Sequence, residues 1–228
     1  MIRLFAPARR ARLNLEGGGF TLIEAIITIM IAGILSMIAY AVFYEPDKLA
    51  LARDQIIRHL RYTQHLAVMD DKFDPNDPNW ELKRWRLKFS TSANPIYAGG
   101  KAGGWTYTIF ADQDRNASNT SSLEEMAVDP LTKRRLSGGV PSRLRSDRPD
   151  FTPEMALWYW RVERLDLHGC LQTIAFDEIG RPFHLYNTSS STTVKRPMLA
   201  TCKITLIGES GEQASLCIAL ETGRVSEC

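Results

Sequence analysis

The sequence of 228 residues lacks the motifs that several large enzyme classes need. It contains no G-x-S-x-G, H-E-x-x-H, Walker A or G-x-G-x-x-G pattern. Histidine is scarce, and its four copies are scattered along the chain at His59, His65, His168 and His184. His59 and His65 are six residues apart, so they do not share a helix face as metal ligands at i and i+4 do. We therefore expect a protein without enzymatic activity.

An excess of positive charge is also lacking in most of the chain. The formal net charge is +2, and residues 1–19 contribute +3 from four arginines against Glu16, which leaves −1 for residues 20–228. Bulk attraction to nucleic acid needs positive charge on the folded body. Residues 133–148 do reach a local +5, from Lys133, Arg134, Arg135, Arg143, Arg145 and Arg148 against Asp147. We interpret these residues as a solvated loop or as a contact with an acidic partner subunit. Binding of nucleic acid is the less favoured alternative.

Charge nearly disappears between Phe20 and Phe43, where Glu24 is the only charged residue. As a helix this run is roughly 36 Å long, which is enough to cross a hydrocarbon core of roughly 30 Å. The arginine-rich leader before it should stay in the cytoplasm, so the rest of the chain lies across the membrane. The sequence thus predicts one transmembrane helix over residues 20–43.

Two other kinds of N-terminal signal could explain the apolar run: a lipoprotein signal and a secretory signal. A lipoprotein signal is excluded because no cysteine precedes Cys170. A secretory signal ending at the Ala39-Tyr40-Ala41 sequence fits the cleavage rule, but its apolar region would exceed the usual length of about 7–15 residues. A retained anchor is the better interpretation.

The six residues from Gly19 to Glu24 read Gly-Phe-Thr-Leu-Ile-Glu, and an apolar run follows them. This pattern resembles the class III signal of type IV prepilins and type II secretion pseudopilins. The resemblance implies that a prepilin peptidase removes residues 1–19 by cutting between Gly19 and Phe20, and then methylates the amino group of Phe20. It also implies that Glu24 sets the register of each subunit during assembly, by pairing with the Phe20 amine of its own chain or of a neighbour.

The apolar helix is expected to continue beyond the membrane over residues 44–69, with a kink or a break at Pro46. Asp47 next to it is a good residue for a new helix start. Apolar or small side chains then recur at helical spacing, at Leu49, Ala52, Ile56, Leu60, Thr63 and Ala67. The predicted fold class is α+β and pilin-like, with a long N-terminal transmembrane helix packed on an antiparallel β-sheet head.

The head, residues 70–228, has the alternating pattern of β-strands. Residues 85–89 and 105–109 each alternate apolar with polar side chains and are expected to form a hairpin. A third β region is predicted over residues 156–176, with a break near His168 and Gly169, although the aromatic run at 157–160 fits a helical turn equally well. Later strands are expected at 183–186, 202–207, 215–220 and 225–228, and residues 188–193 are expected to form a polar loop.

Four cysteines, Cys170, Cys202, Cys217 and Cys228, fall on the side of the membrane that is predicted to be oxidising. Three pairings are open. A turn at residues 222–223 would place Cys217 opposite Cys228, and the remaining pair would then be Cys170–Cys202. Zinc is the alternative, but the sequence has no C-x-x-C motif. Structural disulfides with no bound metal are favoured.

The spacing of Asp112, Asp114 and Asn116 is similar to the first ligands of a calcium loop. Ala117 stands where such a loop needs glycine, so an ordinary surface loop is the favoured interpretation and no cofactor is expected. Calcium stays open as the alternative.

These patterns together predict a minor pilin or pseudopilin, anchored in the inner membrane with its head in the periplasm. Turns at 176–182 and 221–225 are similar to those of H-type pseudopilins and FimT-like minor pilins. The resemblance implies three partners: the prepilin peptidase, other pilin subunits, and the inner-membrane assembly platform. The alternatives are a minor pilin for DNA uptake or adhesion that binds a ligand through its head, and a membrane-anchored periplasmic binding module.

Overall fold

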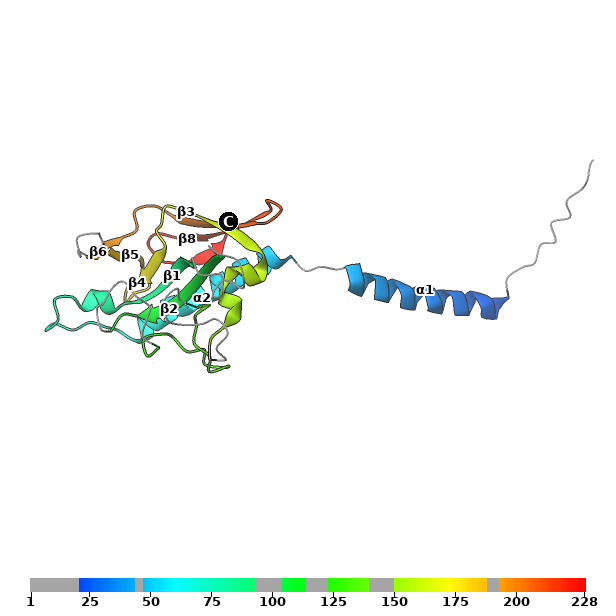
Figure 1. Cartoon of the computed structure of the whole chain (residues 1–228), viewed down its shortest axis with the longest axis horizontal. Helices are drawn as coiled ribbons and strands as arrows, with labels where there is room; N and C mark the ends of the chain where they lie inside the picture. Colours follow the sequence, from blue (N-terminus) through cyan, green and yellow to red (C-terminus); the bar gives the residue numbers. More distant parts are fainter. Residues whose placement is uncertain (1–20, 44–46, 93–103, 114–122, 140–149, 188–192) are drawn as a thin grey trace, which may run out of the picture. The chain divides into compact units, whose positions relative to one another are not determined.

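The structure is a computed structural model that describes residues 21–43, 47–92, 104–113, 123–139, 150–187 and 193–228. It consists of two compact units, residues 1–46 and residues 47–228 (Figure 1). Gly19 and Phe20, where cleavage and methylation are expected, lie outside the described part of the chain.

The first unit contains helix α1 (Leu22–Phe43). Its stretch from Leu22 to Tyr40 is long and apolar enough to cross a membrane. The two hydroxyls of Thr28 and Ser36 donate to backbone carbonyls one turn earlier, at 2.9 and 2.7 Å, so they need no partner from outside the helix. The predicted transmembrane segment is therefore helical. The helix begins at Leu22, two residues after the expected start, and ends at Phe43 as expected.

Helix α2 (Lys48–Met69) begins the second unit. Asp47 caps it, because the Asp47 carboxylate accepts a hydrogen bond from the backbone N–H of Ala50 at 3.1 Å. All six side chains that the helical spacing selected are buried: Leu49, Ala52, Ile56, Leu60, Thr63 and Ala67. Gln55 and Ile57 are buried with them. The expected helical continuation exists from residue 48, and Pro46 lies outside the described residues.

Two antiparallel sheets pack with α2. Their strands are β1 (Trp85–Ser92), β2 (Gly104–Ala111), β3 (Val162–His168), β4 (Thr173–Phe176), β5 (Pro182–Asn187), β6 (Thr193–Pro197), β7 (Cys202–Gly208), β8 (Gln213–Ile218) and β9 (Val225–Glu227). The strand order is β2-β1-β4-β5-β6 in one sheet and β3-β7-β8-β9 in the other. Helix α2 contacts β1 and β4 of the first sheet and β7, β8 and β9 of the second, so one core joins all three elements.

The β1–β2 hairpin predicted from the alternating pattern is confirmed, with Trp85 paired to Ala111. Two strands occupy most of the third β region predicted over residues 156–176, and they are separated at the break expected near His168 and Gly169. Residues 157–160 form a short 3-10 helix, η3 (Leu157–Trp160), and the strands that follow, β3 and β4, belong to different sheets. Strand β6 was missed because its residues adjoin a serine- and threonine-rich stretch that reads as a loop.

The C-terminal hairpin differs from its predicted register by two residues. Cys217 is paired with Ser226, whereas a two-residue turn would have placed it opposite Cys228. The turn is longer than expected: the Ala219 N–H donates to the Arg224 carbonyl at 3.0 Å, and inside this bond the Gly223 N–H donates to the Ala219 carbonyl at 3.0 Å. A shift of two residues leaves every side chain on its original face of the sheet, so Cys228 still lies on the face of Cys217.

Candidate functional site

The first turn of α1 is closed by a reciprocal pair of side chains. The Thr21 hydroxyl accepts from the backbone N–H of Glu24 at 3.3 Å, and the Glu24 carboxylate accepts from the backbone N–H of Thr21 at 3.5 Å. This is a capping box, which satisfies two N–H groups that lack partners at a helix start. The Thr-x-x-Glu spacing is visible in the sequence, but the capping role was not inferred from it. Glu24 therefore holds its own helix start as well as being the only charge of α1.

One turn of α2 is held to the first sheet by a buried polar cluster. The hydroxyl of Tyr107 lies 2.8 Å from Nδ1 of His59 and accepts a hydrogen bond from the Gln55 amide at 3.1 Å. Tyr107 is fully buried. Burial, followed by the nearby Arg58 charge, lowers the pKa of His59 to about 4. Burial also raises the pKa of Tyr107. His59 is thus neutral at neutral pH and fixes the helix on the sheet.

Other α2 side chains bind the C-terminal hairpin and the β4–β5 turn. Arg61 donates to the Val225 carbonyl at 2.7 Å, and Arg53 forms an ion pair with Glu227 at 2.6 Å. The Gln64 amide donates to the carbonyls of Gly180 and Thr222, at 2.8 and 2.9 Å. Gln64 therefore joins the two turns that the sequence analysis singled out separately, at 176–182 and 221–225.

Two disulfides close the C-terminal part of the head, and they form the pairs that the sequence analysis favoured. Cys170 is bonded to Cys202, with Cα atoms 5.0 Å apart, and Cys217 to Cys228, with Cα atoms 5.7 Å apart. The first bond joins the segment after β3 to β7, and the second joins β8 to the C-terminus. Both fit a protein that folds in an oxidising compartment.

The base of the proposed calcium loop is occupied by a buried arginine. The Asp112 carboxylate lies 3.7 Å from Nη2 of Arg86, and both side chains are almost fully buried. Glu125, where the chain returns to β2, accepts from the backbone N–H of Gln113 at 2.6 Å. Asp114 and Asn116 lie outside the described residues. Within the part of the chain that the structure describes, no group of three His, Cys, Asp or Glu residues is placed to hold a metal.

The basic segment divides between surface and interior. Lys133 and Arg134 are exposed, whereas Arg135 is half-buried and donates to the Leu123 carbonyl. Arg143, Arg145 and Arg148 lie outside the described residues. Within the described residues, this segment thus exposes two basic side chains.

His184, on β5, is buried. Burial, followed by the nearby Arg196 charge, lowers the pKa of His184.

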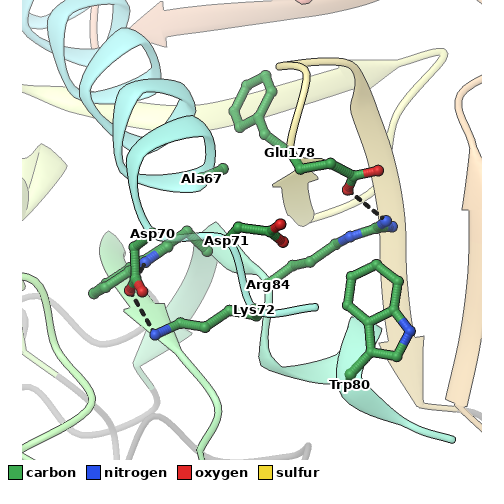
Figure 2. Close-up of a pocket in the computed structure, with 9 residues that line it drawn as sticks. Ala67, Asp70, Asp71, Lys72, Trp80, Arg84 and Glu178 are labelled. Atoms are coloured by element: carbon green, nitrogen blue, oxygen red, sulfur yellow. Dashed lines mark hydrogen bonds and ion pairs between the residues drawn. The ribbon is translucent and has the colours of Figure 1, made fainter. Parts of the chain in front are cut away.

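A hollow lies at the end of α2, where it is lined by Ala67, Trp80, Arg84 and Glu178 among others (Figure 2). The Arg84 guanidinium is 4.8 Å from the ring centres of both Trp80 and Phe183. One of its terminal nitrogens binds Glu178 at 3.0 Å. Its Nε is buried and has no hydrogen-bond partner among the described residues.

The opposite wall of this hollow is formed by Asp70 and Lys72. Asp70 binds Lys72 at 2.5 Å and accepts from the Trp85 indole N–H at 2.8 Å. These hydrogen bonds hold the Asp70 pKa below its usual value although burial opposes them. Aromatic rings beside paired charges can contact a partner's side chain, but no nucleophile is held beside a base here. No sequence pattern reveals this group, because its members are spread over residues 67–178 without a motif.

Comparison with protein-family models, curated proteins and solved structures finds no match for this chain.

Proposed function

We propose that the protein is a type IV pilin-like subunit, a minor pilin or pseudopilin that is stored in the inner membrane and assembled through its N-terminal helix. The observation that carries the proposal is the Gly19–Glu24 sequence directly before a helix that is apolar and long enough to span a membrane. A second helix packed on antiparallel sheets and two disulfides on the predicted outer side support it. The function is mechanical, and the chain carries out no reaction of its own.

Glu24 is the residue on which assembly depends in this proposal. A carboxylate near the end of an apolar helix is costly in lipid unless it is paired. Capping Thr21 satisfies it in the single subunit, and the amine of Phe20, exposed by cleavage, offers it an ion pair in a helix bundle. The carboxylate can therefore exchange a weak local partner for a charged one when subunits assemble.

The test is the N-terminal mass of the chain recovered from membranes, with and without a prepilin peptidase. The expected product begins at methylated Phe20 and forms only in the presence of the peptidase. A chain that keeps its leader under both conditions, or one that begins at Val42 after the Ala39–Ala41 site, would overturn the proposal.

A membrane-anchored binding module is the second candidate, because the hollow beside Arg84 offers aromatic and charged side chains to a ligand. The two candidates differ in what they require of the anchor. A binding module keeps its activity when an unrelated transmembrane helix replaces residues 20–43, whereas a pilin subunit loses assembly.

A further inference from the structure

Strand β3 forms one end of the second sheet. It pairs with β7 on one side, and no other strand in the described part of the chain pairs with it on the other side. A β-bulge at Glu163 shifts the pairing with β7, so the regular part of β3 is Arg164–His168. The outer edge of such a strand presents backbone N–H and C=O groups to which a further strand can bind.

The other three ends of the two sheets are less suited to bind a strand. The outer edge of β2 is bridged by Ser137. Strand β9 contacts α2, whose Arg61 donates to the Val225 carbonyl at 2.7 Å. Strand β6 carries Lys195 and Arg196 and no acidic residue, so it would repel a second strand of the same kind. Among the described strands, β3 therefore has the edge that is best suited to association.

The solvent face of β3 carries two opposite charges. Leu165 is buried, and Arg164 and Asp166 on either side of it lie on the other face, with side chains that are 65% and 56% exposed. Their side chains form an ion pair at 3.3 Å. Charges on an edge strand discourage pairing with foreign strands. Because these two charges differ in sign and are two residues apart, they can instead match the charges of a second copy.

We propose that the outer edge of β3 is a self-association surface, which binds the β3 edge of a second copy in antiparallel orientation with Leu165 opposite Leu165. In this register, each Arg164 lies across from Asp166 of the other copy. Opposite charges that face each other across an antiparallel pair stabilise it. A two-fold axis at Leu165 forms both charge pairs at once, as a closed dimer requires.

Neighbouring registers are disfavoured by the same side chains. A pair centred on Asp166 places two carboxylates opposite each other, and a pair centred on Arg164 does the same with two guanidinium groups. A shift of one residue places Leu165 opposite Asp166, which turns the apolar face of one sheet to the solvent face of the other. The register centred on Leu165 avoids each of these conflicts.

The contact joins two four-stranded sheets into one continuous sheet across the two copies. It involves only residues 164–168 of each copy, whereas stable interfaces usually bury about 1,200–2,000 Å². We therefore expect weak association, which becomes significant where copies are held at high local concentration. The inference goes beyond the proposed function and does not depend on it, because every residue that carries it belongs to the head.

Two charge reversals test this register in the full chain, purified in detergent. Arg164→Asp leaves two acidic residues on the solvent face of β3, and Asp166→Arg leaves two basic ones. Each variant alone is expected to self-associate at least about tenfold more weakly than the unchanged protein, because like charges then face each other. An equal mixture of the two should regain the association, since every charge again faces its opposite. Sedimentation equilibrium in density-matched detergent measures the dissociation constants.

Two controls accompany these variants. The double variant Arg164→Asp/Asp166→Arg exchanges the two charges and keeps both cross-copy pairs, so it should associate as the unchanged protein does. Arg224→Asp reverses an exposed charge in the β8–β9 turn and should have no effect. Because the side chains of Arg164 and Asp166 are exposed, thermal unfolding should show that all variants are folded.

Three outcomes would overturn the inference. The unchanged protein could remain monomeric at the highest concentration reached. The single variants could associate as strongly as the unchanged protein, which would place the contact elsewhere in the chain, α1 included. The single variants could lose association and their mixture fail to regain it, which would exclude the register centred on Leu165. None of these results bears on cleavage after Gly19, so the proposed function is tested separately.

Discussion

Gly223, in the turn between β8 and β9, lies against the carbonyl oxygen of Gly180, in the turn between β4 and β5. The two turns belong to different sheets, and the amide of Gln64 binds both of them from α2. Gly223 has a φ of +62°, which is accessible to glycine at little cost. The two sheets and the helix thus meet at one point where no side chain fits.

Gly223→Ala is therefore expected to destabilise the head by about 2–4 kcal/mol, because the added methyl group collides with the Gly180 carbonyl and the backbone is strained as well. Urea unfolding of the full chain in detergent measures the change. The control is Gly211→Ala, whose φ is +86° but whose surroundings are open, and which should cost only about 1 kcal/mol. Equal losses in the two variants would show that the close approach is unimportant.

Arg86→Met is expected to cost about 3–5 kcal/mol, since it removes a buried guanidinium that lies 3.7 Å from the buried carboxylate of Asp112 and that also donates to the Leu82 carbonyl. Burial, partly opposed by Asp112 and Glu125, lowers the pKa of Arg86 to about 10, so the guanidinium is charged at neutral pH. Arg164→Ala removes an exposed ion pair with Asp166 and should change stability by less than about 0.5 kcal/mol. Thermal unfolding of the two variants compares their losses of stability. A loss below about 1 kcal/mol for Arg86→Met would show that the buried ion pair does not stabilise the head.

His59 should make the head less stable as the pH falls from about 6.5 to about 4. The folded-state pKa of about 4 lies below the ordinary value of 6.5, so the unfolded chain binds a proton in this range and the folded chain does not. The upper limit of the loss is about 3 kcal/mol. His59→Gln keeps a polar partner for Tyr107 but does not titrate, and it should flatten this part of the pH profile of the urea midpoint. A profile that is unchanged by the substitution would show that His59 titrates normally.

Removal of the disulfides should destabilise the head by amounts that follow the length of chain each one closes. The Cys170–Cys202 bond closes a separation of 32 residues and the Cys217–Cys228 bond one of 11. Replacing each pair by serine is therefore expected to cost about 4 and about 3 kcal/mol respectively. Guanidinium unfolding measures the stability lost in each variant. A larger loss from removal of Cys217–Cys228 than from removal of Cys170–Cys202 would contradict the entropic explanation.

The sequence predicted helix α2 well because its buried face depends on spacing alone. Asp47 caps the helix, and each residue chosen by the three-and-four pattern is buried. The pattern also predicted the β1–β2 hairpin, because two alternating runs lie close together in the sequence. Local rules sufficed for both elements.

Features that depend on distant residues were not predictable in this way. Nothing local to residues 162–176 shows that β3 and β4 join different sheets, since each strand is defined by partners far along the chain. The register of the C-terminal hairpin was predicted from a two-residue turn. The actual turn is longer, and its Gly223 contacts Gly180, which is distant in the sequence. The hollow beside Arg84 brings together residues from α2, η1 (Trp80–Lys83) and the β4–β5 turn, which no spacing rule links.

Glu24 caps the start of α1, and the proposed function gives it a second role in assembly, so a pair of variants can separate the two. Glu24→Gln keeps a side chain that can complete the capping box with Thr21 but removes the negative charge. Thr21→Val removes the cap, at a cost of about 1 kcal/mol to the helix start, and keeps the charge. If the charge drives assembly, Glu24→Gln inserts in the membrane normally and fails to cross-link to neighbouring subunits, whereas Thr21→Val still assembles. Cross-linking and the extent of Phe20 methylation, measured by mass spectrometry on the same samples, are the readouts. The reverse result, in which Glu24→Gln assembles and Thr21→Val does not, would show that assembly needs the cap and not the charge. Glu24 would then act only by capping its own helix.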